Sequence, residues 1–126
     1  MNQSDIQAAI FTRLNDQLST PVYDDVPQNS AFPYIVIGDD TSIPFDDDCG
    51  AGFESTITLH VWSIYKGRKE VKDILGSIYN ALHLYDLSIN NGYTVLCTFD
   101  YQETFLDPDG ETRHGVIRFR LLTRSN

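Results

Sequence analysis

The feature of this chain that most limits its fold is a change in the spacing of its apolar residues. In residues 55–62, apolar and more polar side chains alternate, which is the period of a strand with one face in a core. Residues 66–83 instead carry an apolar stripe at helical spacing. A half-apolar helix and a half-apolar sheet each need the other to leave water, so we expect this helix to lie across a sheet.

The remaining apolar segments predict one more helix and three more strands. Residues 5–18 repeat apolar positions at helical spacing, and residues 32–38 form a β-branched and aromatic run that should end at Gly38. Residues 93–102 and 115–122 alternate again. The Asp-Pro-Asp-Gly sequence between these last two runs is a strong turn, which predicts a hairpin.

These elements predict a single α+β domain over residues 1–126, with an antiparallel sheet of about four or more strands packed against two helices. The order along the chain is α-β-β-α-β-β. Strict alternation in residues 93–102 places on one face Val95, Cys97, Phe99 and Tyr101. The expected core, where the longer apolar stripe meets the sheet, consists of Ile57, Leu59, Val61, Ile74, Ile78, Phe99, Ile117 and Phe119.

The charge balance limits the partners of this chain. Eighteen acidic residues against nine basic ones give a formal net charge of −9. This charge disfavours nucleic-acid binding, because phosphates are neutralised by clustered Lys and Arg. With neither a leader pattern nor a run approaching the ~18 apolar residues of a membrane span, the sequence predicts a soluble, non-secreted protein. Its two cysteines, Cys49 and Cys97, lie in unlike contexts and are expected to be reduced thiols.

The most unusual stretch is IPFDDDCGAGFE, residues 43–54, within an acidic segment. The carboxylates of this segment belong to Asp39, Asp40, Asp46, Asp47 and Asp48. Calcium loops alternate their ligands around a central Gly and close with a bidentate Glu, whereas three consecutive Asp side chains cannot converge on one ion. We therefore interpret residues 39–53 as a loop that faces solvent or a partner, without a metal.

No arrangement of residues predicts catalysis or a cofactor. The chain lacks a nucleophile elbow, a reactive Cys beside a base and a phosphate-binding Gly loop. His60, His83 and His114 do not have the spacing of metal ligands, and we expect them to be unrelated. The acids of residues 107–111 are explained by the hairpin turn. The expectation is a protein that is not an enzyme.

Basic residues gather toward the C-terminal end of the chain. Arg118 and Arg120 lie opposite the apolar face of residues 115–122, Arg113 precedes them and Arg124 follows them. In so acidic a chain these side chains should meet acidic residues, either on neighbouring strands or in a second subunit. Arg113, Arg118 and Arg120 are therefore candidate subunit-interface residues.

Nearly end to end, the chain resembles the tail-completion, or tail-terminator, proteins of long-tailed bacteriophages. The most specific stretches are PYIVIG at 33–38, LHVWS at 59–63, which leads through Gly67-Arg68 into 70–82, and DGETRHGVIRFR at 109–120. None is a catalytic motif, and the family supplies no functional motif to transfer residue by residue. The resemblance therefore concerns the structural framework and not a catalytic site.

The resemblance implies a structural virion protein that forms a homohexameric ring at the head-proximal end of the tail. Such a ring ends polymerisation of the tail tube and joins it to the head-tail connector or stopper protein. Its partners would be copies of itself, the tube protein and the connector, with no membrane and no cofactor. It would be made and assembled in the host cytoplasm, and DNA would pass through it without specific binding.

The net charge agrees with a ring around DNA. Six copies of a −9 subunit carry a formal −54, and duplex DNA carries about one charge per 1.7 Å, so repulsion would keep the path free of binding. The alternative is an acidic inhibitor that mimics DNA and binds a basic DNA-binding protein. Binding to such a protein would favour the inhibitor, and ring formation would favour the tail protein.

Ile43 and Phe45 are apolar side chains in a segment that would otherwise face only water. We expect this segment to be poorly ordered in the free subunit and to dock both side chains on an adjacent subunit or tube protein. Asp46, Asp47 and Asp48 would then face basic residues or the DNA path. The alternative is that Phe45 folds back onto its own core.

The charge also predicts that the free protein is monomeric or weakly associating. Added salt should strengthen self-association, because screening reduces the repulsion between acidic subunits. Light scattering at low and high salt measures this directly. A tight hexamer at nanomolar concentration, insensitive to salt, would contradict the electrostatic expectation.

Overall fold

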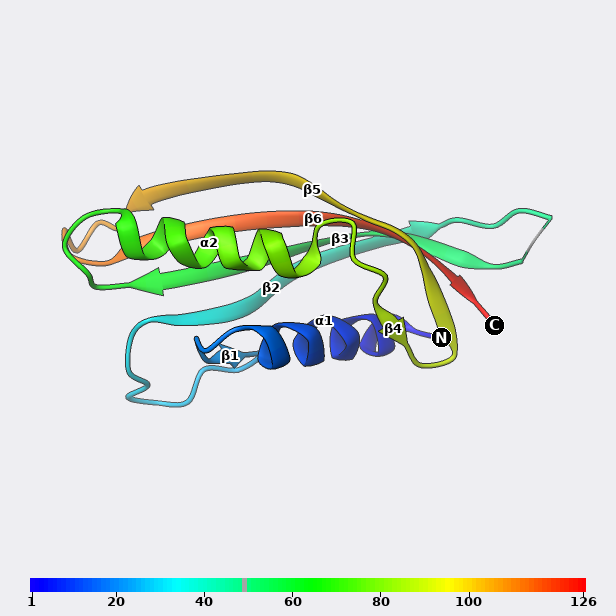
Figure 1. The fold of residues 1–126 in the computed structure, drawn as a ribbon, viewed down its shortest axis with the longest axis horizontal. Coiled ribbons are helices and arrows are strands. Elements are labelled where there is room, and N and C mark those ends of the chain that lie inside the picture. Colours follow the sequence, from blue (N-terminus) through cyan, green and yellow to red (C-terminus); the bar gives the residue numbers. More distant parts are fainter. Residues whose placement is uncertain (49) are drawn as a thin grey trace.

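The protein forms one six-stranded sheet with both helices packed on the same face (Figure 1). The computed structural model describes residues 1–48 and 50–126, so the expectation for the Cys49 thiol lies outside the described residues. The elements are α1 (Gln3–Gln17), β1 (Val22–Tyr23), β2 (Tyr34–Pro44), β3 (Gly52–Ser63), α2 (Lys69–Leu82), β4 (Ser88–Ile89), β5 (Gly92–Leu106) and β6 (Arg113–Ser125).

The order of strands in the sheet is β1-β2-β3-β6-β5-β4. All neighbouring pairs are antiparallel except β1 and β2, which are parallel. This confirms the predicted α+β class, the antiparallel sheet of at least four strands and the two helices. The structure adds β1 and β4, which are too short to produce a recognisable period in the sequence. Neither helix in the described part of the chain is long and apolar enough to cross a membrane.

The predicted core is confirmed where α2 crosses the middle of the sheet. Its buried members are Ile57, Leu59, Val61, Ile74, Ile78, Ile117 and Phe119, while Phe99 is partly buried against them. At Gly115 the helix comes so close to β6 that an added Cβ atom would lie 2.8 Å from Val71 Cγ2. This glycine lets the helix and the strand pack in direct contact, so their apolar faces exclude water.

Much of the acidic segment is strand rather than loop. β2 continues past Gly38 to Pro44 and pairs with β3, with a register shift between Ile37 and Asp40. The hydroxyls of Thr41 and Thr56 hydrogen-bond across this ladder at 2.5 Å. The expectation that the strand ends at Gly38 was wrong, because pairing with a long partner strand outweighs the weak local preference of Gly and Asp against strands.

Strict alternation also fails in β5. The register shifts between Thr94 and Leu96 and again between Phe99 and Tyr101. Cys97 and Phe99 face the helices as expected, but Tyr101 lies across from Arg118 on the opposite face. The shared face predicted for Val95, Cys97, Phe99 and Tyr101 was therefore wrong for Tyr101 and for the exposed Val95. Each bulge adds one unpaired residue and inverts the side chains that follow it.

Replacing Phe119 with Ala should lower the free energy of unfolding by about 2–5 kcal/mol, because it leaves a cavity beneath α2. The same range is expected for Ile74→Ala. Urea denaturation of the purified variants measures both losses. Phe11→Ala is the matched control, since Phe11 is 38% exposed on α1. Losses below ~0.5 kcal/mol at both core positions would show that the helices cover the other face.

Candidate assembly surface

In the described part of the chain, one face of the sheet carries no helix, and we call it the open face. Its side chains come from alternating positions of four strands, β2, β3, β6 and β5, brought level by the strand register. The face combines aromatic rings, imidazoles and paired charges. Its members include Tyr34, Glu54, His60, Trp62, Tyr101, Phe105, His114, Arg118 and Arg120.

Arg118 and Arg120 pair with acids on neighbouring strands of the same chain. Arg118 Nε donates a hydrogen bond to Asp100 Oδ2 at 2.7 Å, and its guanidinium lies 4.6 Å from the centre of the Tyr101 ring. Arg120 forms an ion pair with Glu54. All four charged side chains keep contact with water, which screens both pairs. The sequence left two alternatives for the acidic partners, neighbouring strands or a second subunit. Within the subunit, both arginines pair with acids on neighbouring strands.

Arg113 does not join this pair of arginines. It lies at the start of β6 across from Ser63, whose side chain is buried on the helix side of the sheet. Its Nη1 donates to the backbone carbonyl of Glu111 at 3.2 Å. The three arginines proposed from sequence therefore do not form one patch.

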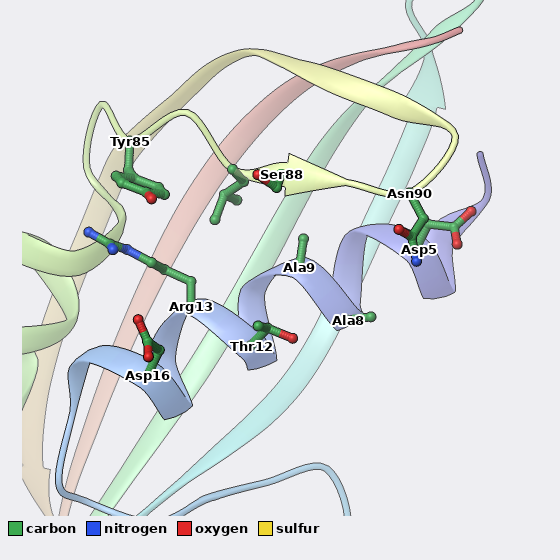
Figure 2. Close-up of a pocket in the computed structure, with 10 residues that line it drawn as sticks. Asp5, Ala8, Ala9, Thr12, Arg13, Asp16, Tyr85, Ser88 and Asn90 are labelled. Atoms are coloured by element: carbon green, nitrogen blue, oxygen red, sulfur yellow. The ribbon is translucent and has the colours of Figure 1, made fainter.

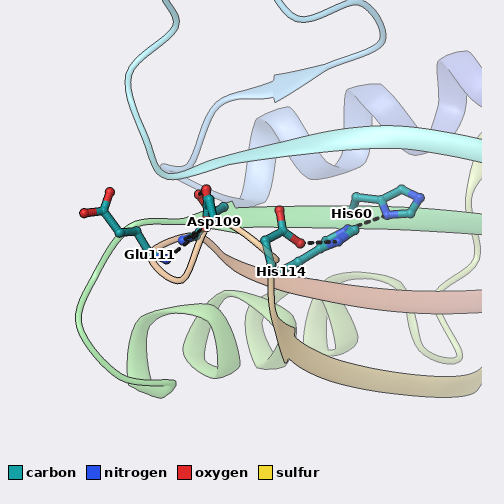
Figure 3. A network of polar contacts seen from close by, with 6 residues as sticks. His60, Asp109, Glu111 and His114 are labelled. Atoms are coloured by element: carbon teal, nitrogen blue, oxygen red, sulfur yellow. Dashed lines mark hydrogen bonds and ion pairs between the residues drawn. The ribbon is translucent and has the colours of Figure 1, made fainter.

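His60 and His114 form a pair on the open face (Figure 3). His60 Nδ1 and His114 Nε2 are 2.8 Å apart, and the His114 ring stacks on Trp62 with 3.8 Å between ring centres. The Asp107 carboxylate lies 3.8 Å from His114 Nδ1. The expectation that these histidines are unrelated was wrong, because the register between β3 and β6 sets His114 opposite Trp62 and diagonal to His60.

Burial of the two imidazoles lowers the pKa of His60 and the pKa of His114. The positive charge that His60 would carry when protonated also lowers the pKa of His114. Nearby carboxylates act in the opposite direction: Asp39 on His60, and Asp107 and Glu103 on His114. The net result favours neutral rings, one of which donates to the other.

The turn next to this pair confirms the hairpin predicted from Asp-Pro-Asp-Gly. Gly110 N–H donates to Asp107 O at 3.0 Å. Asp109 Oδ1 accepts from the backbone N–H groups of Glu111 and Thr112 at 2.9 Å each, and Asp109 Oδ2 accepts from the Thr112 hydroxyl at 2.6 Å (Figure 3). These bonds hold the pKa of Asp109 below its usual range. The acids of this segment therefore order the turn.

The tip of the β2–β3 hairpin is held by Arg124 near the end of β6. The residue is only 6% exposed, and its guanidinium lies 4.1 Å from the centre of the Phe45 ring. It also donates to Phe45 O and forms an ion pair with Asp47. Phe45 therefore contacts Arg124 of its own chain. The alternative considered from the sequence placed Phe45 on the core, but the core cluster does not include it. Ile43 is 54% exposed. The sequence indicated that Arg124 meets an acidic residue, but it did not indicate the hairpin tip, because only the folded register brings Arg124 there.

The five predicted acidic residues do not converge on one point. Asp39 and Asp40 lie in the strand-paired part of the segment, and Asp46 accepts a hydrogen bond from Gly52 N–H at 3.1 Å. Asp48 is exposed near the tip. Within residues 1–48 and 50–126, no group of three or more His, Cys, Asp or Glu side chains could hold a metal ion.

A groove of about 380 Å³ lies between α1 and the β4 segment (Figure 2). Arg13 lies across it, 3.5 Å from the centre of the Tyr85 ring, and its Nε donates to Ala81 O at 2.9 Å. Asp5 and Asp16 also line the groove. Among the described lining residues there is neither His nor Cys, and the one cation is engaged by its own chain.

The open face and the exposed hairpin are available for contact with other proteins, and comparison with known proteins identifies the class of this subunit. The family model for tail completion protein gp17 matches residues 8–124. The chain is 31% identical over 117 residues to tail completion protein gp17 of Bacillus phage SPP1, covering 93% of this chain and 83% of that protein. The chain belongs to this family and is a structural protein of the bacteriophage tail.

The same fold occurs in the solved virion of a native gene transfer agent particle. One chain of that particle superposes with a TM-score of 0.84 at 24% identity, covering 94% of this chain and 93% of that chain. At this identity the likeness shows the fold alone.

The histidine pair predicts that the fold loses stability as the pH falls from about 7.5 to 5.5. The unfolded rings bind protons near their usual pKa of about 6.5, whereas the folded rings have lowered pKa values, so acid favours the unfolded chain. Protonating both rings would also remove the acceptor between them. Urea midpoints should fall over this range, and less steeply for His60→Gln/His114→Gln. Thr58→Val on the same face is the control, and equal slopes in all three proteins would contradict the prediction.

Proposed function

We propose that six copies of this protein close into a ring at the head-proximal end of the tail. The ring ends polymerisation of the tail tube and forms the joint with the head-tail connector or stopper. Membership of the tail completion family is the observation that carries this proposal. The inhibitor alternative has no comparable support.

The charge of the subunit suits a ring through which DNA must move. Each copy is acidic, with a formal net charge of −9, and the exposed arginines of the open face are already paired with Asp100 and Glu54. A channel built from such subunits offers few free cations to phosphates. DNA would then pass without specific binding, because phosphate affinity depends on unpaired Lys and Arg.

The partner-facing element that we propose is the hairpin arm, residues 39–48. Its apolar contact would be Ile43, which is 54% exposed and is not a member of the core cluster. We propose that Ile43 docks on an adjacent subunit or tube protein, while Asp39, Asp40, Asp46 and Asp48 face basic residues or the DNA path. Arg124 holds Phe45 and Asp47 at the tip, so these two would shape the arm.

A phage that lacks this protein should produce overlong or headless tails, visible by negative-stain microscopy of the lysate. Supplying the wild-type protein in trans should restore normal particles. Ile43→Asp should fold normally and fail to restore them, because it places a carboxylate where an apolar contact is required. Ile64→Asp is the matched control, since Ile64 is 55% exposed outside the arm.

Tails of normal length that are joined to heads in the absence of the protein would overturn the proposed function. Full restoration by Ile43→Asp would overturn only the docking role of the arm. Circular dichroism of both variants separates loss of docking from loss of folding.

A further inference from the structure

Among the described residues, two long stretches of the sheet edges have no strand partner. β1 pairs with β2 only at Ile35 and Val36, and β4 pairs with β5 only at Gly92 and Tyr93. Along most of their lengths, β2 and β5 are therefore the outermost strands of the sheet. Figure 1 shows both short strands beside much longer neighbours.

The segment after α2 covers a further part of the β5 edge. Leu84 N–H donates to Cys97 O at 2.7 Å. Phe99 N–H donates to His83 Nδ1 at 3.0 Å, so this histidine serves as an acceptor at the end of α2. Beyond Phe99 the described residues supply no such cover.

The uncovered stretches are residues 40–44, which we call the β2 free edge, and residues 101–106, the β5 free edge. A row of unpaired backbone N–H and C=O groups is a template for another strand, and monomeric proteins usually protect it with charged side chains, above all Lys, with Pro or with β-bulges. Neither edge contains Lys, and each carries one acid, Asp40 or Glu103. The register shifts precede both stretches, and Pro44 stands only at the end of the first. These edges therefore fit backbone pairing with another chain.

We propose that the β2 free edge of one subunit pairs with the β5 free edge of the next, which joins their sheets. This inference rests on the proposed ring and names the contact that closes it. Three successive antiparallel pairings, β2 with β3, β3 with β6 and β6 with β5, make β2 and β5 run in opposite directions. Rotation about a ring axis preserves these directions, so the junction is antiparallel, and two different edges form a head-to-tail contact that can close.

The alternation of side chains limits the register of this junction. Ile43 and Tyr101 both lie on the open face, across from Glu54 and Arg118. Residues opposite each other in an antiparallel pair share a face. Setting Ile43 opposite Tyr101 brings together apolar groups that are 54% and 38% exposed in the subunit. A slip of two residues would instead set Ile43 against the Glu103 carboxylate, which is unfavourable.

This register requires the strands to tilt relative to the ring axis, by an angle that strands of closed barrels adopt. Ile43 is level with Glu54, and Tyr101 is level with Thr58, so the paired edges are offset by four positions along β3. Four positions correspond to about 13 Å, and the four long strands of one subunit span about 19 Å across the sheet. The strands would then incline by about 35° to the ring axis, which is at the lower end of the range for closed barrels.

The size of the closed sheet determines which of its two faces points into the channel. Six subunits with four long strands each would form a backbone circle about 45 Å across. Helices are about 10 Å thick, so a helix layer turned inward would fill most of this opening. The helices therefore lie outside, and the open face with its paired arginines lines the channel.

Cysteine crosslinking tests the junction in assembled particles. In a Cys49→Ser background, Ile43→Cys/Tyr101→Cys should form disulfides between subunits on mild oxidation, giving a ladder of bands up to six subunits on a non-reducing gel. Thr41→Cys/Glu103→Cys is a second pair in the same register. Native Cys97 is buried, which raises the pKa of its thiol to about 12 and keeps it unreactive.

The controls are each single variant and the pair Ile64→Cys/Tyr101→Cys, which should stay at the level of the Cys49→Ser background. If complemented particles have normal tails that contain the protein, yet neither designed pair exceeds these controls, the edge pairing is wrong and the proposed function stands. If phage lacking the protein makes normal tails, the proposed function fails and the junction with it. A ladder from either designed pair, in particles with normal tails, supports the junction.

Discussion

The structure depends on the burial of one face of the sheet beneath α2 and α1. The close approach of α2 to Gly115 seals the apolar side chains of β3 and β6 from water, and α1 packs beside α2 and adds Ile6, Ile10 and Leu14 to the same core. Because both helices lie on one face, the other face must satisfy its own polar groups. The open face follows from this one-sided arrangement, whereas the uncovered edges follow from the short pairing of β1 and β4.

The open face solves that problem by pairing across strands. Arg118 with Asp100, Arg120 with Glu54, and His60 with His114 each join residues from neighbouring strands. Such pairs leave a surface that is polar yet carries little unpaired positive charge. For a structural protein of a phage tail, this surface is suited to lie beside DNA without holding it, since binding to phosphates requires free cations.

The uncovered edges and the hairpin arm serve the proposed assembly in different ways. Edge pairing would join subunits through backbone hydrogen bonds, which depend little on side-chain identity, and Ile43 would add an apolar contact at the same junction. The acidic charge opposes association of free copies, so a ring built in this way would gain from a template such as the tube end. Association would then be directed to the place where the tail must stop.

Local patterns in the sequence determined the class of fold, the α2 stripe, the alternation of β3 and β6, and the turn at Asp107–Gly110, because each depends on residues close together in the chain. The net negative charge and the family resemblance were also evident from the sequence. Tertiary structure alone decided that β2 runs on to Pro44, that Tyr101 faces away from the helices, that His60 meets His114 and that Arg124 holds Phe45. These features depend on strand register and bulges, which are set by pairing between segments far apart in sequence, where a shift of one residue turns every side chain to the other face.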